Sequence, residues 1–166
     1  MTTEPVTFDE LLAYTDEETA RWHEWLRAQD PAVLEVRVGE GSRATVRELI
    51  HHIIAVERRY TDRLRGELPV AYDAIPMHPL DTLFEVHRES RALLRAYIAG
   101  ATPEDWARVL TFETLSAGTL RASARKIAAH AQLHGIRHWA QIATALRLHG
   151  HPQPWGHDLL MSGVME

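Results

Sequence analysis

The sequence contains no cysteine among its 166 residues. This absence excludes disulfide bonds, thiolate ligands for zinc and a cysteine nucleophile. Histidine and carboxylate side chains must therefore hold any metal ion. A sulfur nucleophile, if the chemistry needs one, has to arrive on a small thiol molecule.

Long apolar runs and clusters of basic charge are also missing. No apolar segment reaches the length needed to cross a membrane, and the N-terminal sequence MTTEPVTFDELL lacks the basic stretch and apolar run of a secretory signal. The net charge is −5 with neutral histidines, and the basic residues are almost all dispersed arginines. We therefore expect a soluble cytoplasmic protein with no nucleic-acid and no membrane partner.

The residues that are present predict a single all-α domain spanning residues 1–166. The composition, 45% hydrophobic and 25% charged, is that of one globular domain. Apolar spacing predicts long helices over residues 8–30, 45–65, 81–100 and 123–148. This pattern indicates a four-helix bundle with long connections, in which side chains on facing helices can build a cofactor site.

Capping signals and turn residues mark the expected helix boundaries. Thr45 and Glu48 form a capping box that opens the second helix, Asp81 is the expected N-cap of the third, and Ser123 is that of the last. Residues 107–123 alternate weakly around Ser116-Ala117-Gly118, which suits a small hairpin before the last helix.

Histidines provide the strongest chemical signal. His130, His134 and His138 recur every four residues, so they lie about 40° apart around one helix and share a face. A second pair, His51-His52, lies in the helix at 45–65. The helical row through His52 is apolar and the row through His51 is mostly charged, so we expect His52 to face the core and His51 to face water.

Histidines four residues apart, facing an inward histidine on another helix, predict a divalent metal with an open coordination position. Other metal templates fit less well. Ala131 stands where the helix of a zinc peptidase needs its general-base glutamate, and Glu48 with His51 matches a di-iron Glu-x-x-His motif that has no second copy. Taken singly, each of these histidines is more often a hydrogen-bonded residue at the edge of a core.

The remaining polar candidates are weaker. Gln141 lies near the histidine row, where it could hydrogen-bond a ligand or a neighbouring helix. Glu57 lies about 140° around the helix from His52, so we expect it to pair with an arginine and Glu57-Arg58-Arg59 to form a solvated face. His23 and His87 lie on or beside apolar stripes, which favours a role in the core.

These residues resemble the motifs of the DinB family of helical bundles, which includes the YfiT-like proteins. An early helix of that family carries a histidine followed five residues later by glutamate, matched here by His52 and Glu57. A late helix carries His-x-x-x-His followed after two residues by Gln-Ile, matched by His134, His138 and Gln141-Ile142. The resemblance covers most of the chain.

The resemblance implies that His52, His134 and His138 are the metal ligands and that His130 is a companion outside them. One departure stands beside His138. The family often reads His-His-Arg-Gly-Gln there, whereas Trp139-Ala140 replaces Arg-Gly in this chain, so local helix packing is expected to differ.

Family activities include transfer to small thiols such as mycothiol or bacillithiol, isomerisation of maleylpyruvate, and proposed metal-dependent hydrolysis. We expect a metal-dependent enzyme acting on a small-molecule electrophile with a low-molecular-weight thiol. The reactive group is then a metal-bound thiol or water, and Gln141 is a weak catalytic candidate. A metal-dependent hydrolase and a non-catalytic metal-binding bundle are the alternatives.

Zinc or nickel is the expected metal, although iron and manganese also accept imidazole. The resemblance also suggests a homodimer. Trp22, Trp25 and Trp139 offer apolar surface for such a contact, but buried core positions would use the same residues.

Overall fold

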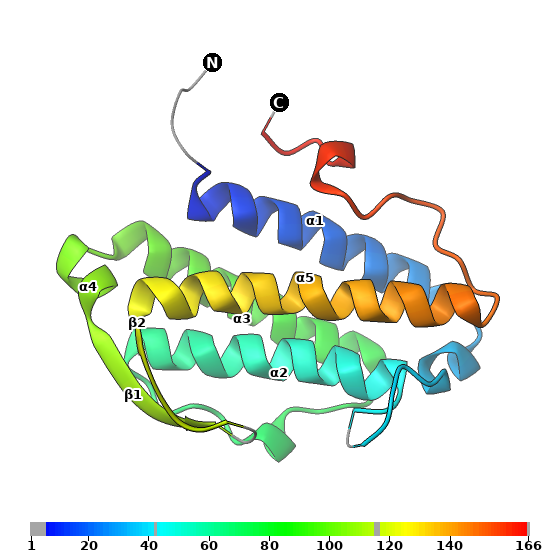
Figure 1. The fold of residues 1–166 in the computed structure, drawn as a ribbon, viewed down its shortest axis with the longest axis horizontal. Coiled ribbons are helices and arrows are strands. Elements are labelled where there is room, and N and C mark those ends of the chain that lie inside the picture. The colour runs from blue at the N-terminus through cyan, green and yellow to red at the C-terminus, as the bar shows by residue number, and fades with distance from the viewer. Residues whose placement is uncertain (1–5, 42, 115–116, 166) are drawn as a thin grey trace.

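The computed structural model describes residues 6–41, 43–114 and 117–165, and helices dominate it (Figure 1). Within these ranges the α-helices and β-strands are α1 (Phe8–Arg27), α2 (Val46–Arg65), α3 (Leu80–Gly100), α4 (Pro103–Ala107), β1 (Val109–Thr114), β2 (Gly118–Ser123) and α5 (Ala124–Leu148). The expected mostly helical fold and the small hairpin are confirmed. The expected turn residue Ser116 and the N-terminal residues 1–5 lie outside the described ranges. None of the helices described is long and apolar enough to cross a membrane.

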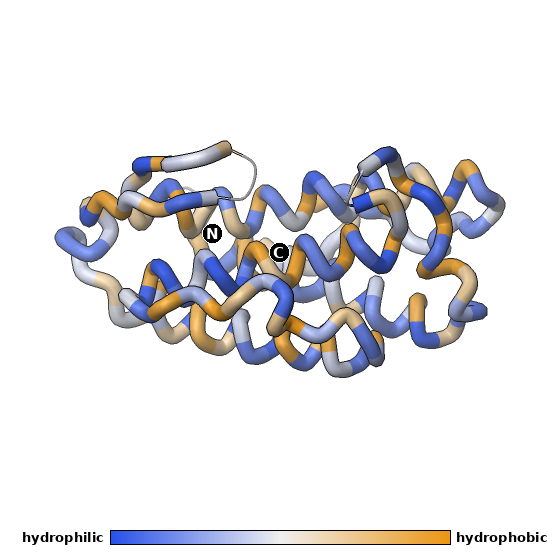
Figure 2. The backbone as a smooth tube through the Cα atoms, turned by 90° about the horizontal axis from the view of Figure 1, so that it is seen from below, coloured by the Kyte–Doolittle hydropathy of each residue, from blue (hydrophilic) through white to orange (hydrophobic). Residues whose placement is uncertain are grey.

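The four long helices run alongside one another. Helix α2 packs against α3 and α5, and α1 packs against the same two helices (Figure 1). Apolar residues recur along each helix between hydrophilic ones (Figure 2), so each helix can turn one face inward. The buried side chains include Trp22, Ile50, Phe84 and Ile142.

Two of the three tryptophans considered for a dimer contact belong to the chain's own core. Trp22 and Trp139 are buried and stack with their ring centroids 5.1 Å apart. The C-terminal tail packs against Trp22, since the Trp155 ring meets it edge-on at 5.3 Å and the Nε1 groups of both rings donate to the Glu18 carboxylate, at 2.8 and 3.2 Å. Trp139 is therefore a core residue of α5.

The expected caps are present on α2 and α5. Thr45 and Glu48 form the capping box, and the Ser123 hydroxyl accepts the backbone N–H of Lys126. The expectation for Asp81 is wrong, because the N-cap of α3 lies two residues earlier, at Pro79, and the helix begins at Leu80. Asp81 lies in the first turn.

The Asp81 side chain reaches across to α1. Its Oδ1 lies 2.8 Å from His23 Nε2 and 3.2 Å from Arg27 Nε. The short polar side chain that resembled a cap therefore connects two helices.

A loop over residues 67–79 covers the outer face of α2, and it overturns the assignment of His51 to solvent. His51 is only 3% exposed. Its Nε2 lies 2.9 Å from the carbonyl oxygen of Ile75, and its ring meets Tyr72 edge-on at 4.9 Å. Helical phase correctly separates the two faces of α2, but it does not reveal that the polar face is covered by another segment.

The hairpin stands beside α2. Strand β1 pairs antiparallel with β2 from Val109↔Ser123 to Thr114↔Gly118. The Arg63 guanidinium attaches it to α2, since it donates to the carbonyl oxygen of Glu113 at 3.3 Å and lies 4.8 Å from the Phe112 ring centre. This attachment makes the hairpin one wall of the pocket described next.

Candidate metal centre

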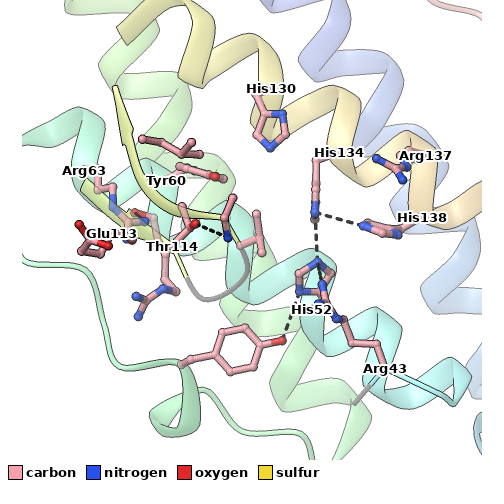
Figure 3. A pocket seen from close by; sticks show the side chains of 15 residues that line it. Arg43, His52, Tyr60, Arg63, Glu113, Thr114, His130, His134, Arg137 and His138 are labelled. Atoms are coloured by element: carbon pink, nitrogen blue, oxygen red, sulfur yellow. Dashed lines mark hydrogen bonds between the residues drawn. The ribbon is translucent and has the colours of Figure 1, made fainter. Parts of the chain in front are cut away.

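Three histidines from two helices bring their Nε2 atoms together (Figure 3). His134 Nε2 lies 3.1 Å from Nε2 of His52 and 3.1 Å from Nε2 of His138. Each of the three offers one ligand atom within 4.8 Å of the others. Tetrahedral zinc, with Zn–N bonds of about 2.0–2.1 Å, separates its ligand nitrogens by about 3.3 Å. The three side chains therefore fit a divalent ion.

Local structure explains this convergence. His134 and His138 are one turn apart on α5, so they share a face of that helix. Helix α2 packs against α5 and contributes His52, whose ring centroid lies 4.8 Å from that of His134 and 5.1 Å from that of His138.

The Nδ1 contact of His138 shows which nitrogen of that ring is free to bind a metal. The Oε1 of Gln141 lies 2.5 Å from His138 Nδ1. An amide oxygen can only accept, so Nδ1 carries the proton and the Nε2 lone pair of His138 is available. Tyr72 Oη makes a longer contact to His52 Nδ1, at 3.4 Å, and the buried Nδ1 of His134 has no hydrogen-bond partner among the described residues.

Burial keeps these imidazoles neutral. It is the largest cause that lowers the pKa of His52 to about 3, with the Arg43 guanidinium adding to it. Burial, followed by the neighbouring His138 and His52, likewise lowers the pKa of His134 to about 3. The pKa of His138 is also lowered, mainly by burial. Neutral imidazole is the form that ligates a metal, so the site is prepared for a cation near pH 7.

The histidines face a pocket of about 560 Å³ between α2, α5 and the hairpin. Its walls include Tyr60, Tyr72 and Thr114, and Figure 3 shows several of these side chains pointing into one space. Arg43 lies beside the histidines, and its Nη1 donates to His52 Nε2 at 3.0 Å.

His130 lines this pocket but stays outside the three-nitrogen group. Its ring centre is 5.5 Å from that of His134 and 5.4 Å from that of Tyr60. Among the residues that the structure describes, no fourth histidine or carboxylate joins the group. The side of the histidines that faces the pocket is therefore open to a small molecule.

Glu57 lies away from the site and connects α2 to α3. Its Oε2 is 3.1 Å from Arg91 Nε and its Oε1 is 3.1 Å from His87 Nδ1. Burial alone would raise the pKa of Glu57, but Arg91 and His87 outweigh it and the pKa is lowered. The expected arginine partner is confirmed, while the expected solvated face is wrong at Glu57, which is 3% exposed.

Two further histidines lie at a second hollow of about 850 Å³ between α1 and α3. His87 is buried, as expected of a core histidine, and His23 stacks on Phe84 with ring centroids 4.1 Å apart. Neither joins a group of three possible metal ligands within the described part of the chain.

Sequence reasoning missed Arg43 and Tyr72. Arg43 lies in the connector before α2, and Tyr72 lies in the proline-bearing loop after it. Neither segment has a helical period, so no pattern in the sequence could orient these side chains toward the histidines.

Comparison with known proteins supports the relationship indicated by the motifs. The family model of the DinB superfamily matches residues 37–142, which include the three histidines and Gln141. No curated protein matches the chain. Since the match spans more than half of the sequence and contains the whole histidine group, the chain belongs to the DinB superfamily.

Proposed function

We propose that this protein is a divalent-metal-dependent enzyme acting on small electrophiles, built on a four-helix-bundle framework. The observation that carries the proposal is the convergence of three neutral imidazoles beside an open pocket. His52, His134 and His138 hold the ion through Nε2, with zinc or nickel the leading candidates and iron or manganese also compatible with imidazole. A bound divalent ion supplies a Lewis acid that lowers the pKa of a thiol or water and polarises an electrophile.

Transfer to a low-molecular-weight thiol is the leading reaction. The chain has no cysteine, so a sulfur nucleophile must enter the pocket as a cosubstrate. The sulfur forms a bond to the electrophilic carbon as the leaving group departs with its bonding electrons. His130 lines the pocket, and burial, followed by Arg137 and Lys126, lowers its pKa, so its imidazole is unprotonated near pH 7 and can accept the thiol proton.

The chain's own residues also position the reactants. Gln141 holds the His138 ring through Nδ1, which is a positioning role. Tyr60, Tyr72 and Leu120 give the pocket an apolar and aromatic lining that excludes water from part of the substrate. Hydrolysis uses the same site with water as the nucleophile, and a non-catalytic metal-binding bundle is the remaining alternative.

Metal analysis combined with a thiol-dependence assay tests the proposal. Purified protein should carry about one divalent ion per chain. His134→Ala should lose the ion, whereas His149→Ala, on an exposed histidine just after α5, should keep it. Turnover of a panel of electrophiles should require both metal and an added thiol.

The outcomes separate the alternatives. Turnover of esters without a thiol identifies the hydrolase. A metal-loaded protein that is inert with every substrate supports the binding bundle. Turnover that continues undiminished after complete removal of the metal rules out a metal-dependent mechanism.

A further inference from the structure

Positive charge without a partner gathers around the pocket. Arg43, Arg59, Arg63 and Arg137 all line it, and Glu113 is the carboxylate among the lining residues. In the described part of the chain none of these four arginines lies within ion-pair distance of a carboxylate, whereas arginines elsewhere, such as Arg91, do.

Neutral acceptors hold two of these guanidinium groups in place. Arg59 donates to the carbonyl oxygen of Val70, and Arg63 donates to that of Glu113 at 3.3 Å. Backbone carbonyls orient a guanidinium but leave its charge uncompensated. Burial and the neighbouring Arg59 both lower the pKa of Arg63, and the opposing effects of Tyr60 and Asp62 do not offset them.

The other two arginines lie at the histidine end of the pocket. Arg43 contacts His52 directly, and Arg137 acts on the pKa of both His134 and His138. Three neutral imidazoles bring no negative charge to a divalent cation. A loaded site would therefore combine the ion with four guanidinium groups and a single exposed carboxylate.

We propose that the pocket binds a small organic anion with an apolar body, whose carboxylate or phosphate group is recognised by these arginines. This inference rests on the proposed metal centre and defines the chemical class of its substrate. Guanidinium forks match both oxyanions and bind them through charge-assisted hydrogen bonds. The body of the molecule fits against Val56, Tyr60 and Leu120.

Arg43 couples the anion to the metal. Its Nη1 donates to His52 Nε2, and that lone pair cannot serve a guanidinium N–H and a metal ion together. Metal binding therefore releases the Arg43 guanidinium beside the site, where an anion gives it a new partner. Without an anion, Arg43 competes with the metal for the lone pair of His52 Nε2. With an anion bound, Arg43 pairs with the anion and no longer opposes metal binding.

The first experiment measures anion binding by calorimetry with benzoate, phenyl phosphate and the neutral analogue benzamide, using protein with and without Zn²⁺. At least one anion should bind with clearly higher affinity than benzamide, and Zn²⁺ should raise the affinity for that anion. Arg63→Gln should weaken the anion about three- to tenfold, because it removes a charge-assisted hydrogen bond in a partly exposed site. Arg65→Gln, an exposed arginine on the same helix outside the pocket, should change it less than twofold.

The second experiment measures Zn²⁺ affinity with and without the anion. Linkage requires the anion to raise Zn²⁺ affinity by the same factor as Zn²⁺ raises anion affinity. Arg43→Gln should raise the Zn²⁺ affinity measured without anion. The same substitution should abolish most of the increase in Zn²⁺ affinity that the anion causes. Arg65→Gln should behave like the unmodified protein in both conditions.

The results distinguish the two proposals. Preference for phenyl phosphate over benzoate, or the reverse, identifies the oxyanion and supports the inference either way. Equal binding of benzamide and the anions, no binding of either anion at millimolar concentration, or weaker Zn²⁺ binding in Arg43→Gln overturns it. Failure to bind Zn²⁺ in the absence of anion, with anion binding to the metal-free protein intact, contradicts the metal centre instead.

Discussion

Gln141 offers the sharpest test of how the metal centre is oriented. Its Oε1 accepts a hydrogen bond from His138 Nδ1 over 2.5 Å. This bond selects the tautomer whose Nε2 lone pair faces the other two histidines. Gln141→Leu keeps the approximate size of the side chain and removes the acceptor, so it should weaken metal binding while leaving all three ligands in place.

The expected loss follows from the position of Gln141. Replacing the outer hydrogen-bond partner of a metal-ligating histidine usually costs 10- to about 100-fold in metal affinity. Gln141 is exposed, so water can partly replace its amide oxygen. We therefore expect the metal affinity to fall by about tenfold, the lower end of this range, which corresponds to about 1.4 kcal/mol of binding free energy. Gln141→Glu keeps the acceptor and adds negative charge, so it should bind the metal at least as tightly as the unmodified protein.

Competition titration of Zn²⁺ against a chromophoric chelator measures these affinities. The His138→Ala background is the control, because Gln141→Leu should have no further effect once the ring that it orients is gone. An unchanged affinity in Gln141→Leu, with a large loss in His138→Ala, would refute the positioning role. An equal loss from Gln141→Leu in both backgrounds would show that it acts through the helix and not through the imidazole.

Three further predictions concern buried polar groups. His51→Ala should destabilise the protein by about 2–3 kcal/mol in urea, because it leaves a cavity and an unpaired carbonyl, yet it should retain more metal affinity than His52→Ala. Glu57→Gln should cost about 3 kcal/mol of stability, since it leaves the buried Arg91 paired only with the partly exposed Asp16, whereas Glu89→Gln on an exposed side chain should stay within about 0.5 kcal/mol. The pKa of His52 and of His134 is about 3 in the fold, against 6.5 for an ordinary histidine, so between these values the unfolded chain binds more protons. The two neutral histidines should thus make their full contribution to the stability of the metal-free protein above about pH 6.5. The free energy of unfolding should fall as the pH drops from there toward 3, more steeply than in a variant with glutamine at both positions.

Local patterns account for most of the helical framework. The capping box at Thr45 and Glu48 and the cap at Ser123 begin α2 and α5 where expected, because a cap depends only on residues within one turn. The prediction of Asp81 as a cap was wrong because an aspartate side chain can equally bind partners on another helix. Its neighbours on α1 are remote in sequence, so no local pattern distinguishes the two roles.

The candidate ligands could also be predicted from the sequence, because helical spacing is a local pattern. Spacing places His134 and His138 on one face of a helix, and the apolar row through His52 turns that residue inward. The inward direction of His52 agrees with the structure, in which its Nε2 meets His134 at 3.1 Å. The outward direction of His51 does not agree, because phase describes one helix and burial depends on everything packed around it.

The sequence by itself determined the helices, the shared face of the α5 histidines and the need for any sulfur nucleophile to come from outside the chain. Tertiary structure alone decided which neighbours complete the site. Arg43 reaches His52 from an aperiodic connector, and Tyr72 reaches it from a loop. Helical periodicity is a property of backbone geometry over a few residues, whereas the pocket is formed by segments whose proximity depends on the packing of the whole chain.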